Sequence, residues 1–488
     1  MSEVTRVLPS TIDYSNVLPE SVPAIARRHK FYAANGTDFN FIGTRTIRIE
    51  LPSASALLDP THTYIGFEAT NAAALGQTLG LDIGGAHCFF DAIRVTQGGR
   101  VLSECREAHR LQCAVIAPSQ LSSDGQASEG IKGSTRSYNT VGAASNAQMG
   151  IGSTADLYGV GTHHNADTYW ANGFSHRFTM NITSGLFGQN KLIPLNLVRT
   201  DAPITIELDM ATAADVGCWS AAPGAGDIRI AEIAVVAQLI EVGQDVMNQF
   251  RAVQESLGGQ LVISGQDWEY SSDTLPANAP GTFMARMPTR KRSLKSLFWI
   301  CQSNDFANAA IANNTLCYNL SYSGQPNIDS WNLKVGSVVH PSEPIRGFGN
   351  TAAAGASLQR GESLMELAKA WGTLGWSHPT GCISGLMYGA TIIAAGRVSN
   401  GANGFGAADA VPTSDTTVCA CPNGLSLEAF AREARESGVD TETLSQDTYL
   451  QLNFNAATAG AEVKQLHMWV LYDQHYYFNS NGDISYSN

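Results

Sequence analysis

Apolar and polar residues alternate along several segments of the chain. Residues 45–51 (RTIRIEL) place isoleucine or leucine at every second position, with polar residues between them. Residues 203–210 (PITIELDM) and 449–454 (YLQLNF) repeat this arrangement. A period of two over this length is typical of half-buried strands in antiparallel sheets. The pattern therefore predicts a chain made mainly of β-strands.

Helical patterns are fewer. Residues 245–257 carry an apolar stripe at helical spacing and end at two glycines. Residues 363–371 carry a second stripe, and Ser363 and Glu366 have the spacing of a capping box at its start. Weaker helical patterns occupy residues 103–117 and 426–438.

The same order of elements occurs twice along the chain. Strand residues 204–210 correspond to 450–454, and the long apolar segment 228–242 corresponds to the segment that begins at residue 463. Segments rich in Gly, Ser and Ala separate the strands at residues 119–161, 341–360 and 399–414. Many short strands, few helices and a doubled pattern predict an all-β fold of two tandem eight-stranded antiparallel jelly rolls.

The length supports two domains, because 488 residues exceed the usual size of a single hydrophobic core. The apolar segment 228–242 closes the first half, and the helix at residues 245–257 is the natural connection to the second. We therefore expect an N-terminal arm at residues 1–40, a first jelly roll at 41–243, a connecting helix at 244–259 and a second jelly roll at 260–488.

The amino-acid composition favours some classes of function over others. Charged residues make up only 15% of the chain, which suits a protein whose exterior is largely covered by copies of itself or by partners. The net charge of −13 argues against a role in coating nucleic acid, which requires an excess of Lys and Arg. The local exception is ARRHK at residues 26–30, for which a solvated turn of helix is the simplest expectation.

The chain shows no signal-peptide pattern at its start and no apolar run long enough to span a membrane. Its nine cysteines are scattered, and the closest pair, Cys419 and Cys421, lacks the spacing of a zinc site. We therefore expect synthesis in a reducing compartment and cysteines that act as small buried apolar residues.

Motifs for catalysis are missing from the sequence. The phosphate-binding loop, the HExxH zinc motif and the GxSxG nucleophile elbow do not occur. A two-domain cupin, which is also a jelly roll, needs two metal-binding histidines one residue apart. The close pair here, His163 and His164, is consecutive, so the two side chains would point to opposite faces of a strand. The sequence therefore predicts a protein that is not an enzyme.

The C-terminal segment VKQLHMWVLYDQHYYFNSNGDISYSN, which starts at residue 463, is the remaining candidate for a metal site. His467, Asp473 and His475 share one face of a strand, but His467 lies too far along the strand to join the other two on one ion. We therefore predict no metal, cofactor or catalytic residue, and a polar outward face. Asn481 and Gly482 predict a tight hairpin turn with positive φ at both positions. The face of the strand opposite His467, Asp473 and His475 is predicted to be core: Leu466, Met468, Val470 and Tyr472.

Four stretches carry a resemblance to a known family: residues 40–70, 88–116, 267–300 and 466–487. The first has a strand, the turn LLDP and a second strand, and the second has paired strands joined by Gly-Gly and followed by a helix. The third, DWEYSSDTLPANAPGTFMARMPTRKRSLKSLFWI, is similar to the opening strands of the family's second jelly roll, and the last to its closing strand and hairpin. In their order and spacing, these stretches resemble the double jelly-roll major capsid proteins of double-stranded DNA viruses, most closely those of Polinton-like viruses and virophages.

The resemblance implies a structural subunit of a virion, made in the host cell, that forms homotrimers with a pseudo-hexameric outline. These capsomers would tile an icosahedral capsid around the genome, together with penton and minor or cement proteins and without a small-molecule substrate. The N-terminus of such proteins lies on the inner side of the shell. Arg27, Arg28 and Lys30 are therefore candidates for weak contact with the genome or an internal membrane. The alternatives are a two-domain cupin-type metalloenzyme and a β-sandwich carbohydrate-binding protein.

Overall fold

The computed structural model describes most of both halves of the chain. The described ranges are 24–116, 170–303, 320, 323–324, 328–347, 361–372, 418–419, 422–429, 438–442, 447–454 and 464–487, without residues 44, 76–77, 82–83, 214, 220–223, 225 and 277–280. The predicted loops 119–161 and 399–414 and the pair His163–His164 therefore lie outside the described residues.

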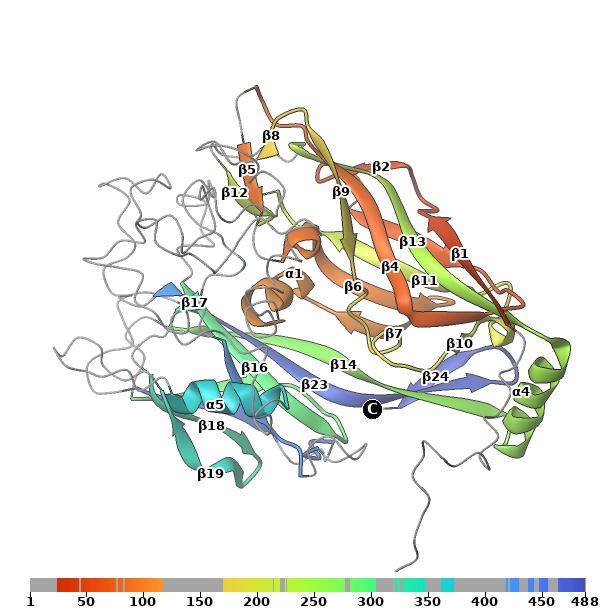
Figure 1. Ribbon diagram of the computed structural model, residues 1–488. Coiled ribbons are helices and arrows are strands. Elements are labelled where there is room, and N and C mark those ends of the chain that lie inside the picture. Colours follow the sequence, from red (N-terminus) through yellow and green to blue (C-terminus); the bar gives the residue numbers. More distant parts are fainter. Residues whose placement is uncertain are drawn as a thin grey trace, which may run out of the picture.

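Eight strands of the N-terminal half form two antiparallel sheets (Figure 1). One sheet pairs β1 with β13, β13 with β4, and β4 with β9; the other has the order β3–β11–β6–β7. The strands are β1 (Ala24–Tyr32), β3 (Thr46–Leu51), β4 (Leu57–Asn71), β6 (Phe90–Gln97), β7 (Arg100–Cys105), β9 (Ser175–Met180), β11 (Ile204–Met210) and β13 (Ile228–Val242).

Eight strands of the C-terminal half form a second pair of sheets. One sheet pairs β14 with β23, β23 with β16, and β16 with β21; the other has the order β15–β22–β18–β19. The strands are β14 (Gln260–Leu275), β15 (Thr282–Met287), β16 (Leu294–Ser303), β18 (Ile328–Val335), β19 (Val338–Arg346), β21 (Asn423–Ser426), β22 (Thr448–Phe454) and β23 (Lys464–Asn479).

The two halves have identical connectivity. Counted in chain order within each half, the first strand pairs with the eighth, the second with the seventh, the third with the sixth, and the fourth with the fifth. The eighth also pairs with the third and the seventh with the fourth. This is an antiparallel ribbon rolled into two facing sheets, which is the topology of a jelly roll. The prediction of two tandem eight-stranded antiparallel jelly rolls is confirmed.

Short elements complete the described part of the chain. The helices are α1 (Ala108–Arg110), α4 (Gln244–Ser256) and α5 (Gly361–Ala370), with 3₁₀ turns η1 (Gly85–Phe89) and η4 (Leu195–Leu197) and the π-helical turn η2 (Leu111–Ile116). The short strands are β2 (Asp38–Asn40), β5 (Thr78–Leu81), β8 (Trp170–Ala171), β10 (Ile193–Pro194), β12 (Gly217–Trp219), β17 (Ser323–Gly324), β20 (Val418–Cys419) and β24 (Ile484–Ser487). None of the helices described is long and apolar enough to cross a membrane.

Two of the predicted helices are confirmed with shifted ends. α4 begins one residue earlier than predicted and α5 two residues earlier, at Gly361. The capping box at Ser363 is therefore wrong: the Ser363 hydroxyl lies inside the helix and donates to the carbonyl of Arg346 at 2.9 Å. The predicted helix at 103–117 starts too early, because β7 extends through Cys105. Ser426 ends strand β21, and most of the predicted helix 426–438 lies outside the described residues.

Burial follows the predicted alternation. In β3, β11 and β22 every second residue is buried, and Ile47, Ile49 and Leu51 are fully enclosed. Four cysteines lie in the apolar cores, as predicted for small buried side chains: Cys88, Cys105, Cys113 and Cys301. Sequence periodicity thus identifies the inward face of these strands correctly.

The basic segment at residues 26–30 is part of a strand and not the turn of helix expected from its composition. It lies in β1, which pairs with β13 along its whole length, from Ala24 opposite Val242 to Tyr32 opposite Ala234. The end of the expected N-terminal arm therefore belongs to the first jelly roll. α4 lies between β13 and β14, at the position of the expected connecting helix. The four-part division of the chain stays a prediction.

The C-terminal hairpin between β23 and β24 has a different turn from the one predicted. The Gly482 N–H donates to the Asn479 carbonyl at 3.0 Å, and the Asn479 N–H donates to the Asp483 carbonyl at 3.0 Å. Gly482 has φ +85°, whereas Asn481 is not among the described residues with positive φ. The loop is thus a three-residue turn that ends in a left-handed glycine, and the prediction of positive φ at both positions is wrong.

Gly482→Ala is expected to lower the free energy of unfolding by about 2–3 kcal/mol, because two costs add. Positive φ costs a residue with a Cβ about 1–2 kcal/mol, and a Cβ at this position would lie 2.5 Å from Arg199 Cγ. Gly99→Ala is the matched control: Gly99 has φ +82° but open space around it, so this variant reports the backbone cost alone. Urea unfolding of both variants measures the difference, and equal losses would rule out the steric contribution.

Candidate functional site

The two jelly rolls share one hydrophobic cluster. β14 and β23 run between the first jelly roll and the outer strands of the second (Figure 1). Their sheet contributes Phe298, Ile300, Trp469 and Tyr476 to the cluster that forms the core of the first jelly roll. The Trp469 indole N–H also donates to the carbonyl of Arg106 at 3.4 Å. The second jelly roll has its own internal core as well, so the β14–β23–β16 sheet is covered on both faces.

This junction corrects the predicted outward face of β23. His467 is 5% exposed and Trp469 is fully buried, because the first jelly roll packs against this part of the strand. Asp473 is also 5% exposed, but its partners Ser293 and Lys295 belong to its own jelly roll. Alternation revealed which side of the strand enters its own jelly roll but not what covers the other side. The predicted core residues are all buried: Leu466, Met468, Val470 and Tyr472.

The structure does not bring the three candidate metal ligands of β23 together. His467 Nδ1 is hydrogen-bonded to the Tyr270 hydroxyl at 2.8 Å, and burial holds the pKa of His467 well below its usual range. Asp473 accepts a hydrogen bond from the Ser293 hydroxyl at 2.8 Å. His475 Nδ1 is bonded to a third group, the hydroxyl of Ser264, at 2.7 Å. Each side chain therefore has its own partner elsewhere in the second jelly roll.

Two glycines allow the jelly rolls to touch through their backbones. A Cβ on Gly265 of β14 would lie 2.1 Å from the carbonyl oxygen of Gly185, which belongs to a loop of the first jelly roll. A Cβ on Gly185 would lie 2.9 Å from the Cβ of Asp267. No larger residue fits at this close approach. The backbone contact brings the fully buried carboxyl group of Asp267 against the first jelly roll.

Asp267 is held by backbone donors from both jelly rolls. Its Oδ1 accepts from the N–H groups of Gly185 at 3.2 Å and of Trp268 at 2.9 Å. Burial nevertheless raises the pKa of Asp267 to about 6, because the charged form loses its water. The folded protein therefore holds a proton at Asp267 over a pH range in which the unfolded chain does not.

Asp267→Asn is expected to gain stability relative to wild type as the pH rises. The folded pKa is raised, so the contribution of Asp267 to stability is fully present below about pH 4 and lost through about pH 6, a loss of about 3 kcal/mol. The variant lacks this loss, so its free energy of unfolding should rise by about that amount relative to wild type between pH 4 and 7. Denaturant unfolding at several pH values measures it. Asp329→Asn, at an exposed position, should change by less than about 0.5 kcal/mol.

The C-terminal hairpin is clamped by the first jelly roll. The Gln97 side chain donates to the Gly482 carbonyl at 2.9 Å and accepts from the Ile484 N–H at 2.6 Å. Arg199 adds an ion pair with Asp483 at 3.2 Å. The last strands of the chain therefore fasten the second jelly roll to the first as well as completing their own sheet.

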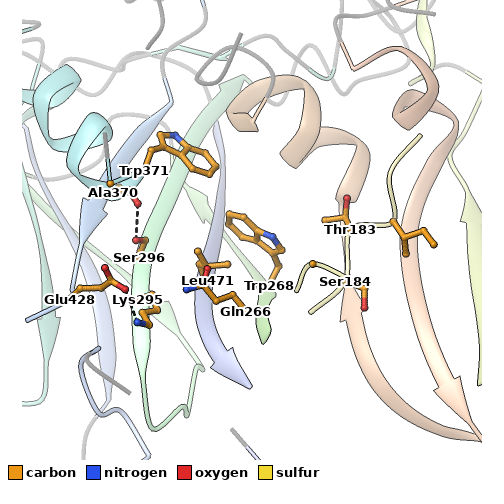
Figure 2. Close-up of a pocket in the computed structure, with 13 residues that line it drawn as sticks. Thr183, Ser184, Gln266, Trp268, Lys295, Ser296, Ala370, Trp371, Glu428 and Leu471 are labelled. Carbon is orange, nitrogen blue, oxygen red and sulfur yellow. Dashed lines mark hydrogen bonds and ion pairs between the residues drawn. The ribbon is translucent and has the colours of Figure 1, made fainter. Parts of the chain in front are cut away.

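A cavity of about 440 Å³ opens at the junction, beside the end of α5 (Figure 2). The rings of Trp268 and Trp371 lie beside it, with their centroids 6.3 Å apart. Its lining comes from a loop of the first jelly roll, from the β14–β23–β16 sheet, from α5 with its following residues and from Glu428 after β21: Ile182, Thr183, Ser184, Gly188, Gln266, Trp268, Lys295, Ser296, Ala370, Trp371, Gly372, Glu428 and Leu471.

Several polar side chains that line this cavity already have partners within the protein. Lys295 is 5% exposed and forms ion pairs with Glu428 at 2.6 Å and Asp473 at 3.4 Å. The Ser296 hydroxyl donates to the Ala370 carbonyl at 3.0 Å, and the Ser184 hydroxyl is also bonded within the protein. None of the described residues that line the cavity is a histidine or a cysteine.

Sequence analysis missed this buried ion-pair network. A signal was present: Lys295 interrupts the apolar run LKSLFWI, where an unpaired charge would be costly. Its acidic partners, Glu428 and Asp473, lie far away in the sequence, so the pairing could not be read from the chain.

The predicted contact residues Arg27, Arg28 and Lys30 lie together on the exposed edge strand β1. Arg27 forms an ion pair with Glu241 at 3.4 Å, and Arg28 donates to the Tyr64 hydroxyl at 2.9 Å. Because side chains alternate along a strand, Arg28 and Lys30 share one face and Arg27 lies on the other. The three charges therefore form a narrow basic edge and not a single patch.

Comparison with known proteins shows a likeness in structure. No family model matches the chain, and no curated protein matches it in sequence. The solved structure of VP54 of the virus PBCV-1, fitted into a reconstruction of the virophage Sputnik, matches with a TM-score of 0.55 and 9% identity over 97% of this chain and 99% of that one. A capsid structure of PBCV-1 matches with a TM-score of 0.54 and 9% identity, over 97% and 100%.

A structure of the Sputnik virophage matches with a TM-score of 0.52 and 11% identity, over 100% of this chain and 93% of that one. The matches extend over both halves of the chain and agree with the doubled strand order found above. The chain therefore has the double jelly-roll fold of these structures.

Proposed function

We propose that the chain is a major capsid protein, a structural subunit that trimerises into pseudo-hexameric capsomers and tiles an icosahedral shell around a viral genome. The observation that carries this proposal is the pair of jelly rolls of identical connectivity, similar over 97% of the chain or more to structures of PBCV-1 and Sputnik. The function is mechanical, and a non-enzymatic role is part of the proposal.

The build of the molecule supports this role. Two jelly rolls that share a hydrophobic cluster form one stiff unit, and three such units around a threefold axis present six jelly rolls in a nearly hexagonal outline. A low content of charged residues suits a protein whose sides are covered by neighbouring copies. The occupied polar groups of the junction cavity favour a structural role over the cupin-type metalloenzyme.

Assembly of the purified full-length chain tests the proposal. We expect light scattering on a sizing column to give three times the chain mass, and electron microscopy to show particles with a hexagonal outline that pack edge to edge. A stable monomer would contradict it. A monomer or dimer that converts a small molecule would favour the metalloenzyme, and a monomer that binds glycans would favour the carbohydrate-binding alternative.

The basic edge of β1 is proposed to face the interior of the shell and to contact an anionic surface there, such as an internal membrane. Each basic residue near an anionic membrane contributes about 1 kcal/mol to binding. Replacing Arg27, Arg28 and Lys30 together with glutamine should therefore weaken binding to phosphatidylserine vesicles at least about tenfold. Trimer formation should be unchanged.

Vesicle sedimentation at low salt measures this binding. The matched control changes Arg27 and Arg28 to lysine, which keeps the charge and should keep the binding. Equal binding by the glutamine variant and wild type would contradict the proposed contact. Loss of binding to a DNA fragment, with vesicle binding retained, would assign the edge to the genome instead. We also propose penton and minor or cement proteins as further partners in the shell.

A further inference from the structure

Three potential metal ligands meet beside the first jelly roll, where β7 leads into α1. Glu107 precedes α1 with φ +50°, a left-handed conformation that is uncommon for a residue with a side chain. The sharp turn brings Glu107 and His109 next to Asp91 at the start of β6. One ligand atom from each of the three lies within 4.8 Å of the other two.

The imidazole of His109 is buried and points between the two carboxylates. The side chain is 3% exposed, and in the described part of the chain its Nδ1 has no hydrogen-bond partner. Nδ1 lies 3.6 Å from Asp91 Oδ1 and 3.8 Å from Glu107 Oε2. Both distances are too long for hydrogen bonds. A buried polar atom without a partner is costly, so this arrangement calls for an atom between the three groups.

The spacing fits a shared metal ion. Two ligands with bonds of about 2.0–2.2 Å at a tetrahedral angle stand about 3.4 Å apart, close to the two observed separations. One imidazole nitrogen with two carboxylate oxygens suits zinc and similar transition ions, whereas calcium and magnesium prefer oxygen ligands alone. The Asp91 side chain is 47% exposed, which provides an entry path and room for water as a further ligand.

We propose that Asp91, Glu107 and His109 form a binding site for one divalent transition-metal ion, with Zn²⁺ the best match. The inference goes beyond the proposed capsid role and does not depend on it.

The electrostatics of the site agree with this assignment. Burial, together with the charge of Arg110, lowers the pKa of His109 to about 3, so its ring is neutral and can offer a lone pair. Burial raises the pKa of Asp91 and of Glu107, although the charge of Arg110 lowers both. Arg110 Nε lies 3.1 Å from Glu107 Oε2 and supplies one positive charge against two carboxylates. A divalent ion would supply the rest.

The ion would act where the two jelly rolls meet. Arg110, which holds Glu107, also donates to the side chain of Gln302 on β16 of the second jelly roll. Fixing Glu107 through a metal would therefore fix this bridge. We expect metal binding to raise the melting temperature of the chain, because the site is assembled only in the folded state.

Calorimetric titration of the chelator-treated full-length chain with Zn²⁺ tests the site. We expect one ion per chain, binding of Ca²⁺ and Mg²⁺ weaker by at least about a hundredfold, and a rise in melting temperature of several degrees with Zn²⁺. Asp91→Asn keeps the size of this half-exposed side chain and should weaken Zn²⁺ binding at least about tenfold. X-ray absorption of the zinc-loaded chain should show nitrogen and oxygen ligands at about 2.0–2.2 Å.

Asp215→Asn is the matched control. Asp215 acts on His109 through its charge and accepts a hydrogen bond from the Thr212 hydroxyl at 2.5 Å, but it contributes no ligand atom. The Asp215→Asn variant removes the same charge as Asp91→Asn and should change the affinity for Zn²⁺ by less than about threefold. The melting temperature of both variants without metal establishes that they fold. No uptake of Zn²⁺ by wild type, or equal affinity in wild type and Asp91→Asn, would overturn the proposal.

Discussion

Replacing Trp469 with alanine is expected to lower the free energy of unfolding by about 3–5 kcal/mol. The side chain is fully buried on β23 and belongs to the hydrophobic cluster of the first jelly roll. Its loss removes a large apolar side chain from the junction, and the indole N–H that donates to the carbonyl of Arg106 disappears with it. The space left by the indole would lie between the two jelly rolls, so both jelly rolls should lose stability together.

Hydrogen exchange combined with urea unfolding separates this effect from a general loss of stability. Trp469→Ala should speed exchange in β7 of the first jelly roll and in β14 of the second. Trp331→Ala is the matched control, since Trp331 is equally buried but lies in the internal core of the second jelly roll. It should speed exchange mainly in β18 and β22. A loss below about 1 kcal/mol for Trp469→Ala would show that the jelly rolls do not share a core.

Lys295→Ala is expected to lower the free energy of unfolding by about 3–5 kcal/mol, because it leaves buried carboxylates without their counter-charge. The ammonium group forms ion pairs with Glu428 and Asp473, and all three side chains are largely removed from water. Adding Glu428→Ala and Asp473→Asn to Lys295→Ala should recover part of the loss, since no buried charge then remains. Recovery would identify the unpaired charge, and not lost packing, as the cause.

An exposed ion pair provides the control for Lys295. Arg286 and Asp447 are 3.2 Å apart on the surface of the same jelly roll, and both side chains are exposed. Arg286→Ala should change the free energy of unfolding by less than about 1 kcal/mol, because water already screens this pair. Similar losses for the two variants in denaturant unfolding would contradict the role given to burial.

Local sequence patterns determined the elements of the fold. The alternation in residues 45–51 and 449–454 identified half-buried strands and their inward faces, because side chains on successive residues of a strand point to opposite sides. Apolar stripes at helical spacing located α4 and α5 to within two residues. The recurrence of the same order of elements predicted two jelly rolls, since such a repeat reflects two similar chain paths.

Turn geometry and the structure of short segments were harder to predict from the sequence, because they depend on a few backbone angles. Asn481 and Gly482 marked the final turn, but the number of residues in the loop depends on how β23 and β24 pair. The segment at residues 26–30 has the composition of an exposed helical turn. Pairing with β13, which lies about 200 residues further along the chain, makes it a strand.

The candidate sites depended on contacts between distant parts of the chain. His467 and Asp473 were predicted to face outward, and no metal ligand was predicted in the sequence at all. The burial of His467 arises because the first jelly roll packs on the second. The network around Lys295 forms within the second jelly roll, and the meeting of Asp91 with His109 forms within the first. A strand's own sequence reveals which of its faces is apolar. Whether another domain covers the other face, and which charges it brings there, is decided only by tertiary packing, because those partners are far away in sequence.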